Sequence, residues 1–206
     1  MKFLLSLIFV LFSSPAFAAR LPHIAVSAEQ WEIPAEDVLQ AVDRTSEIQF
    51  WNAVVNLKTQ LLSLAQQSDP SIPQEADRLA KRVISRIYQL SQEYRVVAGP
   101  HFQNFLIKLH IRQRGYCYHY TEDLLKDLTS SAWQHYQFFW AEAAEGTQHE
   151  SNSVVITARG MPFETGLAVD AWRKGGKPFW ILVKDDQRWD WHPYDYQQLR
   201  PLNLPP

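Results

Sequence analysis

Three side chains in the second half of the chain could act together on a carbonyl group. Cys117 is the only cysteine among 206 residues, so it cannot form an internal disulfide. His149 precedes a run of strand-forming residues, and Asp170 lies within a later apolar run. A thiolate attacks carbonyl carbon when an imidazole takes its proton and a carboxylate orients that imidazole. The residue types and their order therefore predict a nucleophile, a general base and an orienting acid.

The local sequence allows two positions for Cys117. If a helix begins at Cys117, its N-terminal field would favour the thiolate, and backbone N–H groups could stabilise an oxyanion. In that case one face of the helix carries residues 117, 121, 124, 125 and 128. Thr121 before Glu122 and Asp123 is also a good N-cap, and a helix starting there would leave Cys117 in a loop.

His149 is the preferred base because it lies in a polar turn, residues 147–152, that leads into a strand. His119 is two residues from Cys117 and would point away from it on a helix. An acid within an apolar run needs a partner, and an imidazole would suit Asp170. The alternative is a salt bridge from Asp170 to Arg173 or Arg159.

Two halves of different periodicity must position these residues. The first half has apolar residues at helical spacing and the second has short strand-like runs separated by glycine and proline turns. Helices are expected at 28–64, 74–94, 101–112 and from Cys117 or Thr121 to Leu128, and strands at 134–144, 153–159, 166–172 and 178–184. Short connections make the strands antiparallel. The predicted fold class is α+β, a helical N-terminal half followed by a Cys-bearing helix on a roughly four-stranded antiparallel sheet.

The N-terminus resembles a signal peptide. Lys2 precedes a short apolar run at 3–12, and Ala16-Phe17-Ala18 fits a cleavage site after Ala18. The sequence therefore predicts an exported protein, periplasmic or secreted, although an uncleaved anchor is an alternative. Residues 19–206 are expected to form one α+β domain, with a helical part at 28–114, a core at 115–184 and an irregular tail at 185–206. No later stretch is apolar enough for a transmembrane segment.

The overall charge gives no reason to expect a polyanionic partner. Twenty lysine and arginine residues face 22 acidic residues, a formal net charge of −2. The prediction is no nucleic acid, and the balance makes no electrostatic case for an anionic membrane.

Aromatic residues are frequent near the predicted site. Tyr116 and Tyr118 flank Cys117, and Trp140 and Trp172 lie on expected strands. These four are candidate substrate-binding residues that could stack on flat or saccharide-like groups. The alternative is that the strand tryptophans pack in the core of the sheet.

An aromatic-flanked cysteine opening a helix, a histidine leading a strand and an aspartate on the next strand resemble the transglutaminase-like and papain-like thiol hydrolase superfamily. The resemblance covers about residues 114–184. It implies that Cys117 is the nucleophile, His149 the base and Asp170 the orienting residue, acting on an amide or ester by hydrolysis or acyl transfer. The amide-containing substrate would be a peptide, peptidoglycan or a small molecule, with no cofactor.

Two features depart from that superfamily. Papain-type enzymes carry a glutamine ahead of the cysteine as an oxyanion donor, whereas Gln113 is four residues ahead and Gln103 is more remote. The interval from His149 to Asp170 is also long for a hairpin.

Other functions remain open from the sequence. The main alternative is a non-catalytic periplasmic binding or scaffold protein in which Cys117 is a small buried hydrophobic residue. A metal site from Cys117, His119, His135 and His149 is disfavoured by its spacing, so the prediction is no metal. A pair of catalytic carboxylates cannot be recognised from sequence, because the distances are unknown.

Overall fold

The fold is α+β, as predicted. A computed structural model describes residues 44–65 and 69–194. The predicted signal peptide and the start of the first expected helix lie outside the described residues. The helices within them are α2 (Arg44–Leu64), α3 (Ile72–Glu93), α4 (Pro100–Lys108) and α5 (Cys117–Thr129). The strands are β1 (Tyr136–Ala143), β2 (Ser151–Ala158), β3 (Leu167–Val169), β4 (Trp180–Leu182) and β5 (His192–Pro193), with short 3₁₀ turns η1 (Phe163–Thr165) and η2 (Val183–Asp185).

The strands form one antiparallel sheet in the order β4-β3-β2-β1-β5. The four predicted strands are confirmed, and they pair with their sequence neighbours. β3 and β4 are shorter than predicted. The fifth strand lies in the segment predicted to be an irregular tail, where it pairs with Ala141 and Glu142 of β1. Two residues, one of them proline, are too short a run for a period-two pattern to be seen.

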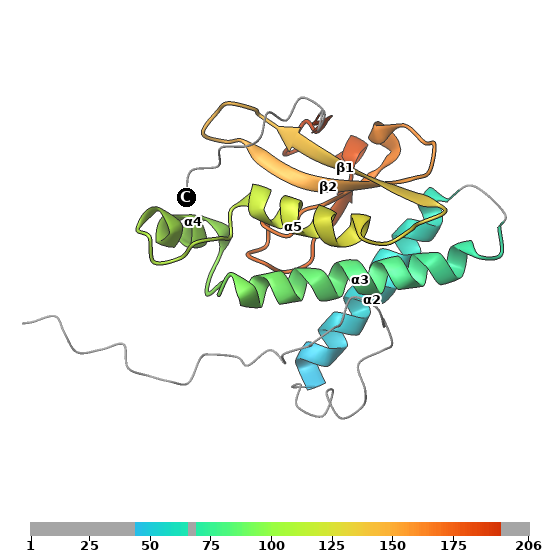
Figure 1. Cartoon of the computed structure of the whole chain (residues 1–206), viewed down its shortest axis with the longest axis horizontal. Helices are drawn as coiled ribbons and strands as arrows, with labels where there is room; N and C mark the ends of the chain where they lie inside the picture. The colour runs from blue at the N-terminus through green and yellow to red at the C-terminus, as the bar shows by residue number, and fades with distance from the viewer. Residues whose placement is uncertain (1–43, 66–68, 195–206) are drawn as a thin grey trace, which may run out of the picture.

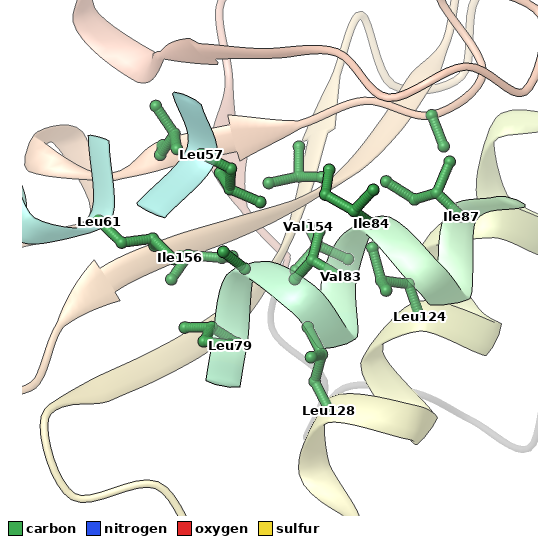
Figure 2. Close-up of a cluster of buried hydrophobic side chains, with 14 of the residues drawn as sticks. Leu57, Leu61, Leu79, Val83, Ile84, Ile87, Leu124, Leu128, Val154 and Ile156 are labelled. Carbon is green, nitrogen blue, oxygen red and sulfur yellow. The ribbon is translucent and has the colours of Figure 1, made fainter. Parts of the chain in front are cut away.

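The main core lies between the helices and one face of the sheet. Figure 1 shows α5 and α3 below the sheet, with α2 crossing α3. Apolar residues of α3 recur every three or four positions, so a single stripe of the helix is buried. Figure 2 shows leucine and isoleucine side chains from α2, α3 and α5 meeting Val154 and Ile156 of β2. Because strand side chains alternate, even-numbered residues of β2 face the helices.

Two buried polar side chains on α3 fix that helix to the rest of the core. Glu75 accepts hydrogen bonds from the backbone N–H groups of Gln134 (2.8 Å) and His135 (3.1 Å) just before β1. Arg82 donates to both carboxylate oxygens of Asp127 on α5, at 2.8 and 3.0 Å. Both are nearly inaccessible, so each charge is buried with a partner, as burial requires.

The other face of the sheet is covered by the chain itself. We call residues 183–193 the C-terminal strap, because they run from β4 at one edge to β5 at the opposite edge. Val183, Trp189 and Trp191 of the strap pack against a second apolar cluster that includes Val155 and Ala168. Trp191 is only 4% exposed. The segment that was expected to be irregular therefore helps to cover the second face of the sheet.

Helix α4 is where predicted, but its apolar stripe faces outward. Phe102, Phe105 and Leu109, which form the apolar stripe of this helix, are 46%, 52% and 50% exposed. The buried residue of α4 is Gln103. In the described part of the chain, every helix is too short or too polar to cross a bilayer.

Candidate functional site

The sequence left two helix starts open, and the structure has the earlier one. Cys117 is the first residue of α5, after Tyr116 in extended conformation (φ −68°, ψ 161°). Gly115 makes the entry turn at φ +127°, a region that disfavours L side chains. A Cβ there would also come within 2.8 Å of Gln103 Cγ. Thr121 lies inside the helix, and its hydroxyl donates to the Cys117 carbonyl at 3.1 Å.

The Cys117 sulfur is half-buried against the start of β2. Its Sγ lies 3.9 Å from the Glu150 carbonyl oxygen and 3.9 Å from Asn152 Nδ2. Asn152 is held there by Trp140, whose Nε1–H donates to Asn152 Oδ1 at 2.6 Å. The Asn152 amide also donates to Glu150 Oε1 at 3.3 Å. We call the residues around the sulfur, namely Cys117, Trp140, Glu150 and Asn152, the thiol niche.

The thiol niche favours the neutral thiol. Burial raises the pKa of Cys117, against the opposing effect of the backbone and side-chain N–H groups of Asn152 and the backbone N–H of Tyr118. The charge of Asp170 raises that pKa further. The reactive form of a cysteine is the thiolate, and a raised pKa disfavours it.

His149 does not approach the sulfur. It lies in an exposed turn between β1 and β2, in which Ala144 and Gly146 adopt positive φ. Its backbone N–H donates to Thr147 Oγ1 at 3.1 Å. Among the described residues, its imidazole forms no hydrogen bond or ion pair with Cys117 or Asp170. The predicted thiol–imidazole contact is therefore not formed in this structure.

The preferred partner for Asp170 was also wrong, and the salt bridge to Arg173 is the one formed. Asp170 directly follows β3 and is 1% exposed. It accepts from Arg173 Nε at 2.8 Å and from the Arg173 backbone at 2.9 Å. Arg173 also donates to Asp186, which accepts from Trp191 Nε1 at 2.8 Å. A guanidinium three residues away is always charged and has several donors, so it satisfies this buried acid better than an imidazole in a solvated turn.

His119 proves to be a structural residue. Its Nδ1 accepts the backbone N–H groups of Gly115 (3.1 Å) and Tyr116 (3.2 Å). Burial, with a contribution from Arg114, lowers the pKa of His119 to about 4. The ring is therefore neutral at pH 7 and caps the loop before α5. A side chain at the third helical position often bonds back to the cap, but that signal could be used only once the helix start was known.

The four predicted substrate-binding aromatics fall into two groups. Tyr116 and Tyr118 are half-buried beside Cys117, with rings stacked at 5.7 Å between centroids and 15° between planes. Trp140 and Trp172 are 9% and 8% exposed. The Trp172 Nε1–H donates to Asn104 Oδ1 of α4 at 3.1 Å. Their contact with a substrate stays a prediction, which the exposure favours for the tyrosines.

Asn152 is the site residue that sequence reasoning missed. Alternation along β2 places it on the same face as Val154 and Ile156, toward α5. That pattern would have identified residue 152, instead of residue 149, as the neighbour of a cysteine heading α5. Within residues 44–65 and 69–194, no three His, Cys, Asp or Glu side chains are grouped to hold a metal ion.

Comparisons with protein-family models, curated proteins and solved structures find no match to this chain. The resemblance to transglutaminase-like and papain-like proteins therefore rests on the order of residues in the sequence and stays a prediction.

Proposed function

We propose that this chain is an exported, non-catalytic binding or scaffold protein whose thiol is a packing residue. The observation that carries the proposal is the surroundings of the Cys117 sulfur, an amide and a carbonyl at 3.9 Å. A thiol hydrolase needs an imidazole within hydrogen-bond reach of the sulfur. In the thiol niche, Asn152 occupies that place, and an amide cannot accept a proton at neutral pH.

Two further observations support the non-catalytic role. Burial raises the pKa of Cys117, which is the reverse of what an activated thiol requires. Asp170 is engaged by Arg173 and is not available to orient a histidine. Cys117 also packs against the main apolar core, the ordinary environment of a structural cysteine.

A thiol hydrolase or acyltransferase is the second candidate, and one observation favours it. Glu150, whose carbonyl contacts the sulfur, directly follows His149. A rearrangement of the exposed turn could therefore bring the imidazole toward Cys117.

Alkylation of Cys117 by iodoacetamide from pH 6 to 10 separates the two candidates. For a packing residue we expect slow labelling at pH 6 to 7, rising only at alkaline pH, with the same rates in His149→Asn. His110→Asn is the matched control, because that histidine is exposed on a different segment. Cys117→Ala should abolish labelling, since no other cysteine exists.

Asn152→His tests whether the missing imidazole is the reason for low reactivity. It places an imidazole beside the sulfur, and each unit by which it lowers the Cys117 pKa gives about tenfold faster labelling near pH 7. Fast labelling of the unmodified protein at pH 6, slowed in His149→Asn alone, would instead establish the hydrolase pair and refute the proposal.

A further inference from the structure

Helix α4 and the residues after it present an apolar surface to solvent. Phe102, Phe105 and Leu109 lie on one stripe of the helix, and Ile111 follows at 55% exposure. We call these four residues the α4 patch. Figure 1 shows α4 at one end of the molecule, beside the start of α5 and the C-terminal end of α3. The patch therefore lies on a projecting element, outside both apolar clusters.

The outward orientation of the patch is fixed by polar contacts on the opposite side of the helix. Gln103 Nε2 donates to the carbonyl oxygens of Tyr94 (3.0 Å) and Arg114 (3.1 Å). Asn104 accepts from Trp172 at 3.1 Å. Rotating α4 to bury its phenylalanines would break these bonds and leave buried carbonyls without donors.

The segment of the sequence that contains the patch carries basic residues and no acidic ones. From residue 94 to residue 121 the sequence contains no aspartate or glutamate, and it contains Arg95, Lys108, Arg112 and Arg114. Arg114 is paired with Glu122 and Asp123. The ion pairs of the described residues include none with Arg95, Lys108 or Arg112. Arg95 and Lys108 are exposed and Arg112 is partly exposed, so their charges are available to an anionic partner.

We propose that the α4 patch docks on an anionic phospholipid surface. The phenylalanine, leucine and isoleucine side chains would enter the interface while the surrounding cations meet phosphate groups, the arrangement of interfacial amphipathic segments. A second copy of this chain is a poor occupant, because a symmetric contact would bring the same cations together. The proposal goes beyond the scaffold role and does not depend on the chemistry of Cys117.

The basic residues near α4 explain why the net charge of the whole chain is a poor guide to membrane binding. The whole chain has a formal charge of −2, which argued against an anionic membrane. Electrostatic attraction acts over about one Debye length, roughly 10 Å at moderate salt. The unpaired cations on and beside α4, Arg95, Lys108 and Arg112, therefore matter more for docking than the sum over the chain.

The test is vesicle flotation with the full chain, purified after any processing of its termini in the cell. Vesicles contain either phosphatidylcholine alone or phosphatidylcholine with one third phosphatidylglycerol. We expect binding to the anionic vesicles, weakened by salt. Lys108→Gln with Arg112→Gln should reduce the partition coefficient about 25-fold, or about fivefold per charge. Phe102→Ser with Phe105→Ser should reduce it at least about tenfold.

Ile48→Ser with Val55→Ser is the matched control, because these α2 side chains are 60% and 58% exposed but lie outside the α4 patch. It should bind as the unmodified protein does. A second measurement places a fluorophore on Leu109→Cys in a Cys117→Ser background, with Val55→Cys as its control. A blue shift on anionic vesicles at residue 109 alone supports docking through α4.

Three outcomes would overturn the proposal. They are no binding to anionic vesicles, equal binding to neutral vesicles, and binding that is insensitive to the patch variants. Dimerisation that is lost in Phe102→Ser with Phe105→Ser, seen by light scattering without vesicles, would assign the patch to self-association instead. If a patch variant fails to fold, the fluorophore at residue 109 decides between the same outcomes.

Discussion

Asn152 determines the chemical character of the residue beside it. Its amide lies next to the Cys117 sulfur, while its own oxygen is taken by Trp140. An amide donates hydrogen bonds to sulfur but cannot carry away its proton. The position that cysteine takes at the head of a helix is therefore not enough to make it a nucleophile. In the proposed non-catalytic role, the identity of this one facing residue on β2 is what keeps the thiol unreactive.

A second residue-scale feature, His119, makes folding stability depend on pH. Its pKa is lowered to about 4 by burial and Arg114, whereas an imidazole in an unfolded chain titrates near 6.5. Between these values the unfolded chain binds more protons, so stability is full above about pH 6.5 and falls as the pH drops toward 4. Between pH 7 and pH 5 we expect His119 to reduce the free energy of unfolding by about 1–2 kcal/mol.

Urea unfolding of His119→Gln at the two pH values tests this. Glutamine can still accept backbone N–H groups at the third helical position, but it does not titrate. We expect a smaller loss of stability on acidification than in the unmodified protein. An equal loss in both proteins would show that His119 does not control the pH response.

At the residue scale, the sequence predicted the local structure around Cys117 and Asp170 better than it predicted which side chains contact them. Local patterns limited the start of α5 to Cys117 or Thr121 and showed that Asp170 needs a partner. The identity of that partner does not follow from them, because Arg173 and His149 were both chemically suitable. Which of the two pairs with Asp170 depends on their positions in the folded chain. Arg173 is three residues from the acid, whereas His149 lies in a solvent-exposed turn.

At the element scale, Gln103 holds α4 in its unusual orientation. It is 1% exposed and bridges the end of α3 to the loop before α5. Gly115 packs directly on it, so the turn that positions Cys117 depends on the same side chain. One buried amide therefore orients both the α4 patch and the entry to α5.

Replacing that amide should destabilise the protein. Gln103→Leu keeps the volume but leaves two buried carbonyl oxygens without donors, so we expect a loss of about 2 kcal/mol in the free energy of unfolding. Gln113→Leu is the control, because Gln113 is exposed and should change stability by less than about 0.5 kcal/mol. Chemical denaturation measures both. Similar values for the two variants would contradict an anchoring role for Gln103.

The same helix marks the limit of periodicity as a guide. Apolar spacing correctly predicted that α3 and α4 are helices, and for α3 it also predicted the buried face. For α4 the apolar side is exposed, because the pattern shows which side is apolar and not whether another element covers it. Only the hydrogen bonds of Gln103 and Asn104, formed with distant segments, reveal the orientation.

At the scale of the whole molecule, helices and sheet share one core. Side chains of α2, α3, α5 and β2 belong to the same apolar cluster. We therefore expect cooperative unfolding, in which helix loss and tryptophan exposure coincide. Helix content reports mainly on the first half of the chain. Tryptophan fluorescence reports mainly on the second half, since six of the eight tryptophans lie at or after residue 133.

Ile84→Ala at the centre of that cluster tests the cooperativity. Ile84 is fully buried, and its truncation should lower the free energy of unfolding by about 2–5 kcal/mol. Circular dichroism and tryptophan fluorescence should shift to the same new midpoint. Val55→Ala, at an exposed site, is the control. Two separate midpoints in Ile84→Ala would show that the helical half and the sheet unfold independently.

The C-terminal strap adds a constraint on when this protein can finish folding. A chain is synthesised from its N-terminus, so β1, β2 and β3 exist before residues 183–193 have been made. Until then, Val155, Ala168 and the rest of the second apolar cluster lack their cover. Chains that expose apolar surface during folding are prone to aggregate. The second face of the sheet is thus protected from association with other chains only after residues 183–193 have been made and Trp191 reaches its place.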